Sequence, residues 1–458
     1  MNRIKQLAKN SIILIVTKLL SQATNLLLLP VYTGILSTDE YGIIDLITTI
    51  ILIGIPLLSF QIEMGMFRFF ITSEDNDQEI KVVTTSFGLL CINVLVFSSI
   101  FIMVQCFGHF KYGVYSWLLI IIEAYNMFAL QLCRAEGDNF GYGLCSTLIV
   151  IIKAGCCVIF IVVFKLAIMG YLYSSFIAQL FGIIVLAYKS HIYKFIKKKS
   201  FDIKLLVKLL KYSIPLVFNQ IASWIINFSD RIIIVSCLGL GANGIYSAAS
   251  KLSNIINGVL AMFNLAWTEN VTRNIKNNEN YDYISNAINV FMRLLLLVVV
   301  IIIGVLSCAF DLLIGKNYFE AYNHVPILLF AMGCSAVSAF LGSVYTAYGM
   351  TAEIAVTTMM TAVINILINV CFVMRIGIYA ASISTLIAFF VLAVLRYCKL
   401  LKRQLICVQT DGMIGPLLLC FISWGLYCMR KKIVCICVAL VSVFLLVKMV
   451  TDKCKFTR

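Results

Sequence analysis

The chain has 458 residues, of which 62% are hydrophobic and only 12% charged, and its mean hydropathy is +1.00. A soluble protein needs more polar surface than this balance supplies, so a soluble enzyme or binding domain is excluded. The net charge of +15 does not indicate nucleic-acid binding. The basic residues cluster in alternate loops between apolar runs, which is the positive-inside pattern of a polytopic membrane protein.

Long apolar runs recur along the chain, each able to cross the ~30 Å hydrocarbon core of a bilayer. We expect helices, because only helices and closed barrels satisfy the backbone in lipid, and barrel strands are far shorter than these runs. The first run, Ser11 to Leu36, is too long for a cleaved signal peptide and is expected to remain as the first span. About fourteen spans are predicted, at 10–36, 41–71, 79–106, 114–133, 141–165, 168–190, 212–238, 243–272, 283–314, 322–348, 351–374, 376–400, 413–430 and 432–450.

The distribution of lysine and arginine predicts the orientation. With a cytoplasmic N-terminus, roughly 24 basic residues fall on the inner side against 7 on the outer side, so both termini are predicted to be cytoplasmic. The inner loops that flank the later spans contain Arg273, Lys276, Arg396, Lys399, Lys402 and Arg403. The outer cluster at 430–432 breaks the rule, so we interpret the last two spans as an accessory pair under weak topological constraint; a shallow hairpin is the alternative.

The two halves of the chain resemble each other. A shift of 202 residues, without a gap, aligns about eleven identical residues, among them Asn25 with Asn227 and Gly42 with Gly244. The shift covers six spans, an even number, so both halves are predicted to enter the membrane from the same side, as parallel repeats about an axis normal to it. A shared apolar bias is the alternative explanation of the identities.

The predicted fold class is therefore an all-α polytopic membrane protein with two six-helix bundles around a central cavity. The predicted domains are an N-terminal bundle at 1–190, a basic cytoplasmic linker at 191–211, a C-terminal bundle at 212–403 and an accessory helix pair at 413–450.

Charged side chains lie inside several predicted spans, although a charge at membrane depth costs at least ~2.5–3.5 kcal/mol. Such groups must face the bundle interior, a water-filled cavity or each other. The basic residues, which are the candidate binding groups for an anionic substrate, are Lys18, Lys153, Arg231, Lys251 and Arg293. The acidic residues, which are candidates for gating or ion pairs, are Asp45, Glu63, Glu123, Asp230 and Glu269.

Two interpretations of these charges remain open. Asp230 and Arg231 are adjacent and point about 100° apart on a helix, so Asp230 can bridge to Lys251 across the helix pair and leave Arg231 available. Glu123 and Lys153 lie at similar depth on consecutive spans and can pair in the same way. In the other interpretation, the lysines and arginines line the central cavity and bind an anionic substrate.

The sequence also contains two prolines within predicted spans, and it lacks recognisable catalytic motifs. Pro30 and Pro56 remove backbone hydrogen bonds from the first two spans and are candidate hinges. No phosphate-binding loop, catalytic constellation, metal-ligand spacing or long loop is found, so the protein is not expected to be an enzyme or to carry a cofactor or metal. The seventeen cysteines lie mostly in apolar runs and are expected to be free thiols.

Three stretches resemble a known family. The stretches LLPVYTGILSTDEYGIIDL (28–46), KYSIPLVFNQI (211–221) and SDRIIIVSCLGLGANGIYSAASKL (229–252) are similar to span junctions of bacterial polysaccharide flippases of the O-antigen and capsule type. These flippases form the polysaccharide transporter branch of the multidrug/oligosaccharidyl-lipid/polysaccharide exporter superfamily. The resemblance covers roughly residues 5–400, and Arg231 and Lys251 match positions of its motif.

The resemblance implies a flippase that moves polyprenyl-diphosphate-linked oligosaccharide repeat units from the cytoplasmic to the outer leaflet by alternating access, for surface polysaccharide biosynthesis. It also implies the bacterial cytoplasmic membrane as location, with a polymerase, other polysaccharide-assembly proteins and a coupling cation (H⁺ or Na⁺) as partners. A cation-coupled multidrug exporter and a peptidoglycan-precursor flippase are the alternatives.

Overall fold

The computed structural model describes residues 17, 19–24, 26–108, 111–197, 200–274, 281–407 and 412–456, and every regular element in this part of the chain is a helix. Eleven of the described helices are long and apolar enough to cross a membrane. Two shorter apolar helices, Leu19–Ile35 and Ile414–Cys428, accompany them. The predicted all-helical membrane architecture is confirmed, whereas the count of fourteen spans stays a prediction.

The chain divides into two compact units. The first consists of Met1–Val31 and Ile43–Phe228, and the second of Tyr32–Gly42 and Ser229–Arg458. The second division falls inside the long helix α10 (Ile203–Leu238) and not in the basic segment 191–211, whose last residues already belong to that helix. The short segment 32–42 between the first two predicted spans belongs to the second unit.

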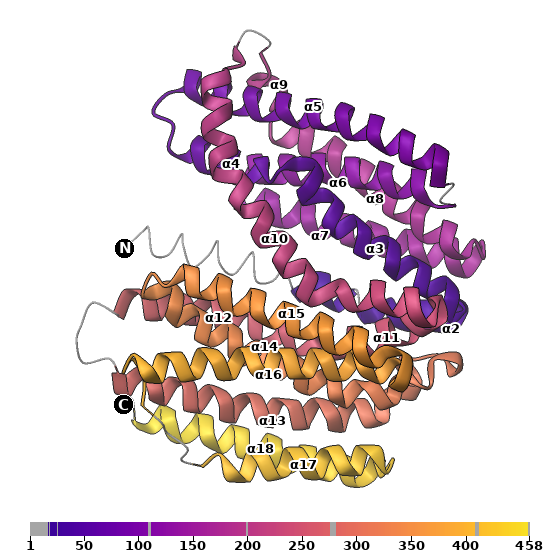
Figure 1. Ribbon diagram of the computed structural model, residues 1–458, viewed down its shortest axis with the longest axis vertical. Coiled ribbons are helices and arrows are strands. Elements are labelled where there is room, and N and C mark those ends of the chain that lie inside the picture. Colours follow the sequence, from indigo (N-terminus) through magenta and orange to yellow (C-terminus); the bar gives the residue numbers. More distant parts are fainter. Residues whose placement is uncertain are drawn as a thin grey trace. The chain divides into compact units, whose positions relative to one another are not determined.

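The helices of the first unit pack through small and branched side chains. Helix α8 contacts both α6 and α7 (Figure 1), around a core that includes Ala129, Ile149 and Ala178. Small residues at such contacts let helix backbones approach closely in a membrane. The helices are α2 (Leu29–Ile35), α3 (Thr38–Ser59), α4 (Ile62–Ile71), α5 (Asn76–Gly108), α6 (Gly113–Ala135), α7 (Asn139–Cys157) with the π-helical turn Val158–Val163, α8 (Ala167–Lys189) and α9 (Ile192–Phe195); α2 and α3 continue into the second unit.

The second predicted span is not one helix. Pro56 lies inside α3, and the break comes one turn later, where Phe60 and Gln61 have φ angles of 50° and 54°. The Leu58 carbonyl near the helix end accepts a hydrogen bond of 2.9 Å from Asn93 Nδ2. Irregular backbone at membrane depth needs such internal partners. The hinge role of Pro56 stays a prediction.

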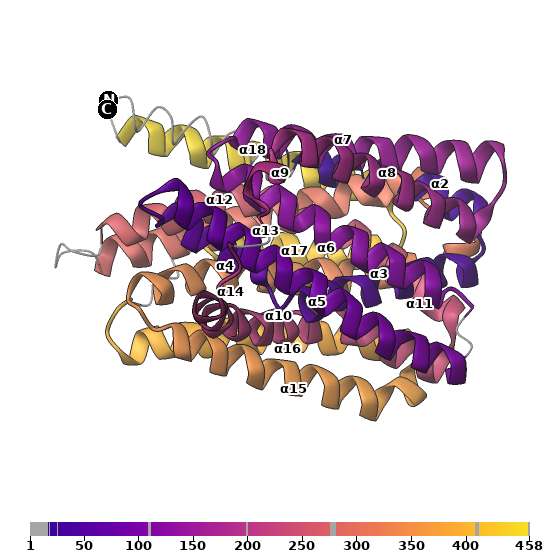
Figure 2. The same ribbon diagram turned by 90° about the horizontal axis from the view of Figure 1, so that it is seen from above.

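The second unit is built around α14 and α16. Their facing sides are rich in small buried residues, such as Ala331, Ser338, Ala381 and Ala388, so the two helices pack closely. Figure 2 shows α15 and α16 side by side. The remaining helices of the unit follow in chain order: α11 (Leu240–Ser253), α12 (Ile255–Asn274), α13 (Tyr281–Leu313), a 3₁₀ turn (Lys316–Tyr318), α14 (Ala321–Ala347), α15 (Thr351–Ile376), α16 (Ile378–Lys402), α17 (Ile414–Cys428) and α18 (Lys432–Phe456).

The predicted accessory pair, α17 and α18, packs along α13 (Figure 1). A Cβ atom at Gly304 of α13 would lie 2.4 Å from the Ala439 methyl and 3.0 Å from the Cys435 carbonyl oxygen, so glycine is required for this close approach. An ion pair between Lys432 and Asp311 joins the same helices at one end.

The segment 32–42 forms hydrogen bonds with other residues of the second unit. The Tyr318 hydroxyl lies 3.0 Å from the carbonyl of Leu36 and 2.7 Å from that of Ser37, and is the donor to both. The Gly315 amide donates to Thr33 Oγ1 over 3.1 Å. This short connection is therefore a structural part of the second unit.

Two equivalent glycines of the repeat touch each other's helices. A Cβ at Gly42 would lie 2.0 Å from the Leu240 carbonyl oxygen, and a Cβ at Gly244 would lie 2.1 Å from that of Thr38. A shift of 202 residues converts Gly42 into Gly244 and Thr38 into Leu240. The contact therefore has local two-fold symmetry, which agrees with the repeat inferred from the sequence.

Alanine at either glycine is expected to destabilise the protein. A methyl group there meets backbone atoms, which cannot rotate away, so the loss should equal or exceed the roughly 1–3 kcal/mol of ordinary overpacking. We expect Gly42→Ala and Gly244→Ala to lower the apparent Tm in detergent. Gly34→Ala is the matched control in the same segment, because a Cβ at Gly34 meets nothing within 4 Å. Equal Tm values for all three variants would contradict the contact.

Candidate functional site

Asp230 is a buried charge of the second unit with three hydrogen-bond donors. Its side chain, 1% exposed, accepts hydrogen bonds from Tyr246 (2.8 Å), Asn369 (2.9 Å) and Thr385 (2.6 Å). The donors come from α11, α15 and α16, while Asp230 lies on α10. The bridge to Lys251 considered from the sequence is not among these contacts. The carboxylate is stabilised by neutral donors, which leave its negative charge in place.

Lys251 lies against tyrosine rings. Its ammonium is 5.4 Å from the centre of the Tyr32 ring and 4.9 Å from that of Tyr41, both in the segment 32–42. Cation–π contacts of this kind compensate lost hydration without adding a negative charge. Arg231, 6% exposed, interacts electrostatically with its neighbour Asp230. Both basic residues of the family motif therefore lie inside the second unit.

In the first unit, Lys153 contacts a hydroxyl. Its ammonium donates to the Tyr171 hydroxyl at 3.1 Å, and that hydroxyl lies 2.9 Å from Thr48 Oγ1. Glu123 and Lys153 attract each other electrostatically, but the described ion pairs do not include this one. The predicted proximity of the two charges is found, whereas a direct salt bridge between them is not.

Two other acidic candidates, Asp45 and Glu63, lie on different helices of the first unit. Asp45 lies on α3 and is 7% exposed, and Glu63 lies in the first turn of α4 and is 4% exposed. The N-terminus of a helix favours a negative charge, which accounts for Glu63 after the break in the second span. Their gating roles remain predictions.

Arg293 lies beside the accessory helices. A Cβ at Gly412, just before α17, would lie 2.8 Å from the guanidinium carbon of Arg293. Pro30 is the second residue of α2 and lies inside the longer apolar helix Leu19–Ile35, where proline cannot donate a backbone hydrogen bond. Lys18 and the side chain of Glu269 lie outside the described residues.

Arg396 is a buried charge that the sequence reading missed. It was counted among the inner basic residues although it falls within the predicted span 376–400, and in α16 (Ile378–Lys402) it is only 5% exposed. Its guanidinium donates to the Ser338 carbonyl (2.7 Å), to Thr358 Oγ1 (3.0 Å) and to Thr357 Oγ1 (3.5 Å). Its position four residues before the end of the predicted span was the available signal that it belongs to the helix.

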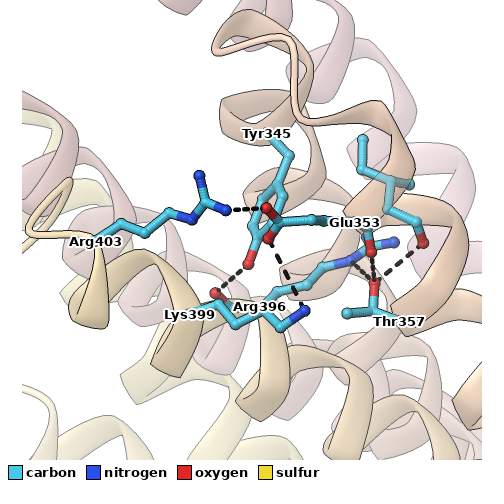
Figure 3. Close-up of polar contacts among 7 residues, drawn as sticks. Tyr345, Glu353, Thr357, Arg396, Lys399 and Arg403 are labelled. Carbon is cyan, nitrogen blue, oxygen red and sulfur yellow. Dashed lines mark hydrogen bonds and ion pairs between the residues drawn. The ribbon is translucent and has the colours of Figure 1, made fainter.

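Figure 3 shows the surroundings of Arg396. Glu353 of α15 forms ion pairs with Lys399, at 3.9 Å, and with Arg403. Lys399 lies about one turn after Arg396 on α16. The Tyr345 hydroxyl of α14 donates to the Arg396 carbonyl over 2.9 Å. Arg396 and Glu353 therefore join α14, α15 and α16 at one end of the second unit.

A match to a known protein family accompanies this arrangement of buried charges on apolar helices. A family model described as "Polysaccharide biosynthesis protein" matches residues 7–268, which is more than half of the chain. The chain belongs to the polysaccharide biosynthesis protein family. The match includes Arg231 and Lys251, and it confirms the resemblance recognised from the sequence. No curated protein sequence matches the chain significantly.

Solved structures confirm the fold. The lipid II flippase MurJ in its inward closed conformation has a TM-score of 0.70 at 13% identity, covering 97% of this chain and 100% of that one. A multidrug resistance MATE family transporter of the MOP superfamily, in an inward-facing conformation, has a TM-score of 0.67 at 16% identity, covering 84% and 94%. This family member thus has the all-helical, multi-pass membrane fold that these two solved structures share.

Replacing Arg396 should cost far more stability than replacing its exposed neighbour. Arg396→Ala removes charge-assisted hydrogen bonds of about 1.5–3 kcal/mol each and leaves the Ser338 carbonyl without this donor. Arg403→Ala removes a half-exposed ion pair, which contributes little because water screens it. We expect a large loss of apparent Tm in the first variant and almost none in the second. Similar Tm values would contradict the role assigned to Arg396.

Proposed function

We propose that this protein is a flippase that moves polyprenyl-diphosphate-linked oligosaccharide repeat units from the cytoplasmic to the outer leaflet of the bacterial cytoplasmic membrane. Its family match over residues 7–268 carries the proposal, because that range contains the intramembrane basic residues of the motif. A diphosphate loses its hydration when it crosses hydrocarbon, and arginine and lysine can replace that hydration with charge-assisted hydrogen bonds. Both termini are proposed to be cytoplasmic.

Alternating access between the two leaflets is the mechanism that this proposal requires. The cargo would bind at Arg231 and Lys251 when the site faces the cytoplasm, and leave when it faces outward. Pro30 lies next to the division between the two units at Val31 and Tyr32, which supports a hinge there. A polymerase and other polysaccharide-assembly proteins would take up the product on the outer side.

Two other functions are compatible with the fold. Structural neighbours include a multidrug transporter and a lipid II flippase, but likeness at 13–16% identity indicates the fold alone. The family match favours a polysaccharide intermediate as cargo over a drug or a peptidoglycan precursor.

Removing the two motif charges should stop polymer export. In a host that lacks its own flippase, we expect Arg231→Gln with Lys251→Gln to reduce surface polymer at least about tenfold, since the cargo loses two ligands worth together more than ~1.4 kcal/mol. The measurement is the amount of surface polymer relative to the amount of protein inserted in the membrane.

Two control variants make that result specific. Arg375→Gln with Lys316→Gln removes the same kinds of charge from the exposed ends of helices and should keep export. Arg231→Lys with Lys251→Arg keeps both charges and should restore part of it. Normal export by the first double variant would remove these residues from the mechanism.

Asp230 is proposed to hold the coupling cation. The carboxylate, the hydroxyls of Tyr246 and Thr385 and the amide of Asn369 form a buried, mostly oxygen-based set of the kind that protons and Na⁺ bind. In the described part of the chain, no group of three or more His, Cys, Asp or Glu side chains could hold a metal ion. A monovalent cation therefore fits better than a transition metal.

Cation binding should appear as a thermal shift. At a cation concentration of 100 Kd, binding adds about 2.7 kcal/mol to the folded state. We expect either Na⁺ at constant pH, or lower pH at constant K⁺, to raise the apparent Tm of the wild type but not of Asp230→Asn. Asp311→Asn, at an exposed ion pair, is the matched control and should keep the shift. A wild type without either shift, or an unchanged shift in Asp230→Asn, would contradict this assignment.

A further inference from the structure

A pocket opens within the second unit, between α12, α13 and α14, and its lining does not include Asp230, Arg231 or Lys251. Its volume is about 360 Å³, within the range of small-ligand sites in proteins. None of its described lining residues is charged. The aromatic and amide residues that line it are Phe263, Trp267, Asn270, Tyr283, Asn286 and Phe340.

The inner wall of this pocket is a fixed stack of aromatic rings. Phe340 lies between Trp267, with ring centres 4.3 Å apart, and Phe291, with ring centres 4.1 Å apart, and both pairs are nearly parallel. The Trp267 indole N–H donates to the Phe340 carbonyl over 3.2 Å. These contacts fix the rings before any ligand arrives, so binding orders few side chains.

The mouth of the pocket combines aromatic rings with amides. Phe263 and Tyr283 are 44% and 46% exposed, so their rings are accessible at the mouth. Asn270 and Asn286 are also exposed, and the Tyr283 hydroxyl donates to Asn270 Oδ1 over 2.9 Å. Rings offer flat apolar faces, and amides offer both hydrogen-bond donors and acceptors.

An interfacial aromatic belt is the simpler explanation for rings near a helix end, but it does not fit Trp267. In such a belt the indole N–H points to the lipid headgroups. Here the Trp267 side chain is buried, at 6% exposure, and its N–H is used inside the protein. The rings therefore form a cavity wall and not a membrane anchor.

We propose that this pocket binds a sugar ring of the lipid-linked cargo. A pyranose has an apolar C–H face, which stacks on aromatic rings, and a rim of hydroxyls, which pair with amides. The pocket is formed by the end of α12 and the start of α13, beside the loop predicted to be cytoplasmic from Arg273 and Lys276. The glycan is then recognised on the side from which the cargo is loaded. This inference rests on the proposed flippase function.

The test compares carriers with and without sugar. Purified protein in detergent is titrated with bare polyprenyl diphosphate and with polyprenyl diphosphates that carry one hexose, one N-acetylhexosamine or one deoxyhexose. We expect the best glycosylated probe to bind about tenfold more tightly than the bare carrier, which corresponds to ~1.4 kcal/mol. Phe263→Ala with Tyr283→Ala should remove that difference and leave the affinity for the bare carrier unchanged.

A control variant and three contradicting outcomes separate the sugar pocket from the flippase proposal. Phe444→Ala with Tyr188→Ala removes two exposed aromatic rings outside the pocket and should keep the tenfold difference. If the wild type binds all probes equally, the sugar pocket is wrong and the flippase proposal stands. If it binds none of them, the flippase proposal fails, and the sugar pocket fails with it. An unchanged preference in Phe263→Ala with Tyr283→Ala also overturns the pocket.

Discussion

The structure depends on how charges are kept inside apolar helices. An unpaired charge in hydrocarbon is costly, and an ion pair offsets part of that cost but neutralises the charge. Two of the buried charges have neutral hydrogen-bond partners: three donors for Asp230, which also interacts electrostatically with Arg231, and a carbonyl with two hydroxyls for Arg396. Lys153 contacts a tyrosine hydroxyl, and Lys251 contacts tyrosine rings. Each arrangement joins at least two helices.

Hydropathy alone predicted the membrane class and most helices, because the apolar runs are long and the bilayer leaves the backbone few alternatives. The breaks in these helices were not predictable in the same way. Near the helix break at Phe60 and Gln61, the Leu58 carbonyl accepts a hydrogen bond from Asn93, a residue of another helix. Arg396 was misplaced because the charge count treats every arginine near a span end as a loop residue, whereas its partners come from α14 and α15.

Comparing the two halves of the sequence identified equivalent residues but not their contacts. Aligning Gly42 with Gly244 required only the sequence, but their mutual contact depends on the fold. The buried partners of Asp230 lie 16, 139 and 155 residues away, so spacing along the chain could not identify them. The aromatic pocket likewise combines residues of three helices, and no sequence motif predicts it.

The most direct test of the central claim is transport in proteoliposomes with carriers that differ only in charge. The same saccharide is attached to a polyprenol through a diphosphate or through a neutral linker of similar length, and its appearance in the opposite leaflet is followed. If the basic residues inside the protein attract the diphosphate, we expect rapid movement of the diphosphate carrier and background rates for the neutral carrier. Equal rates for both carriers would show that the buried charges serve only to hold the helices together.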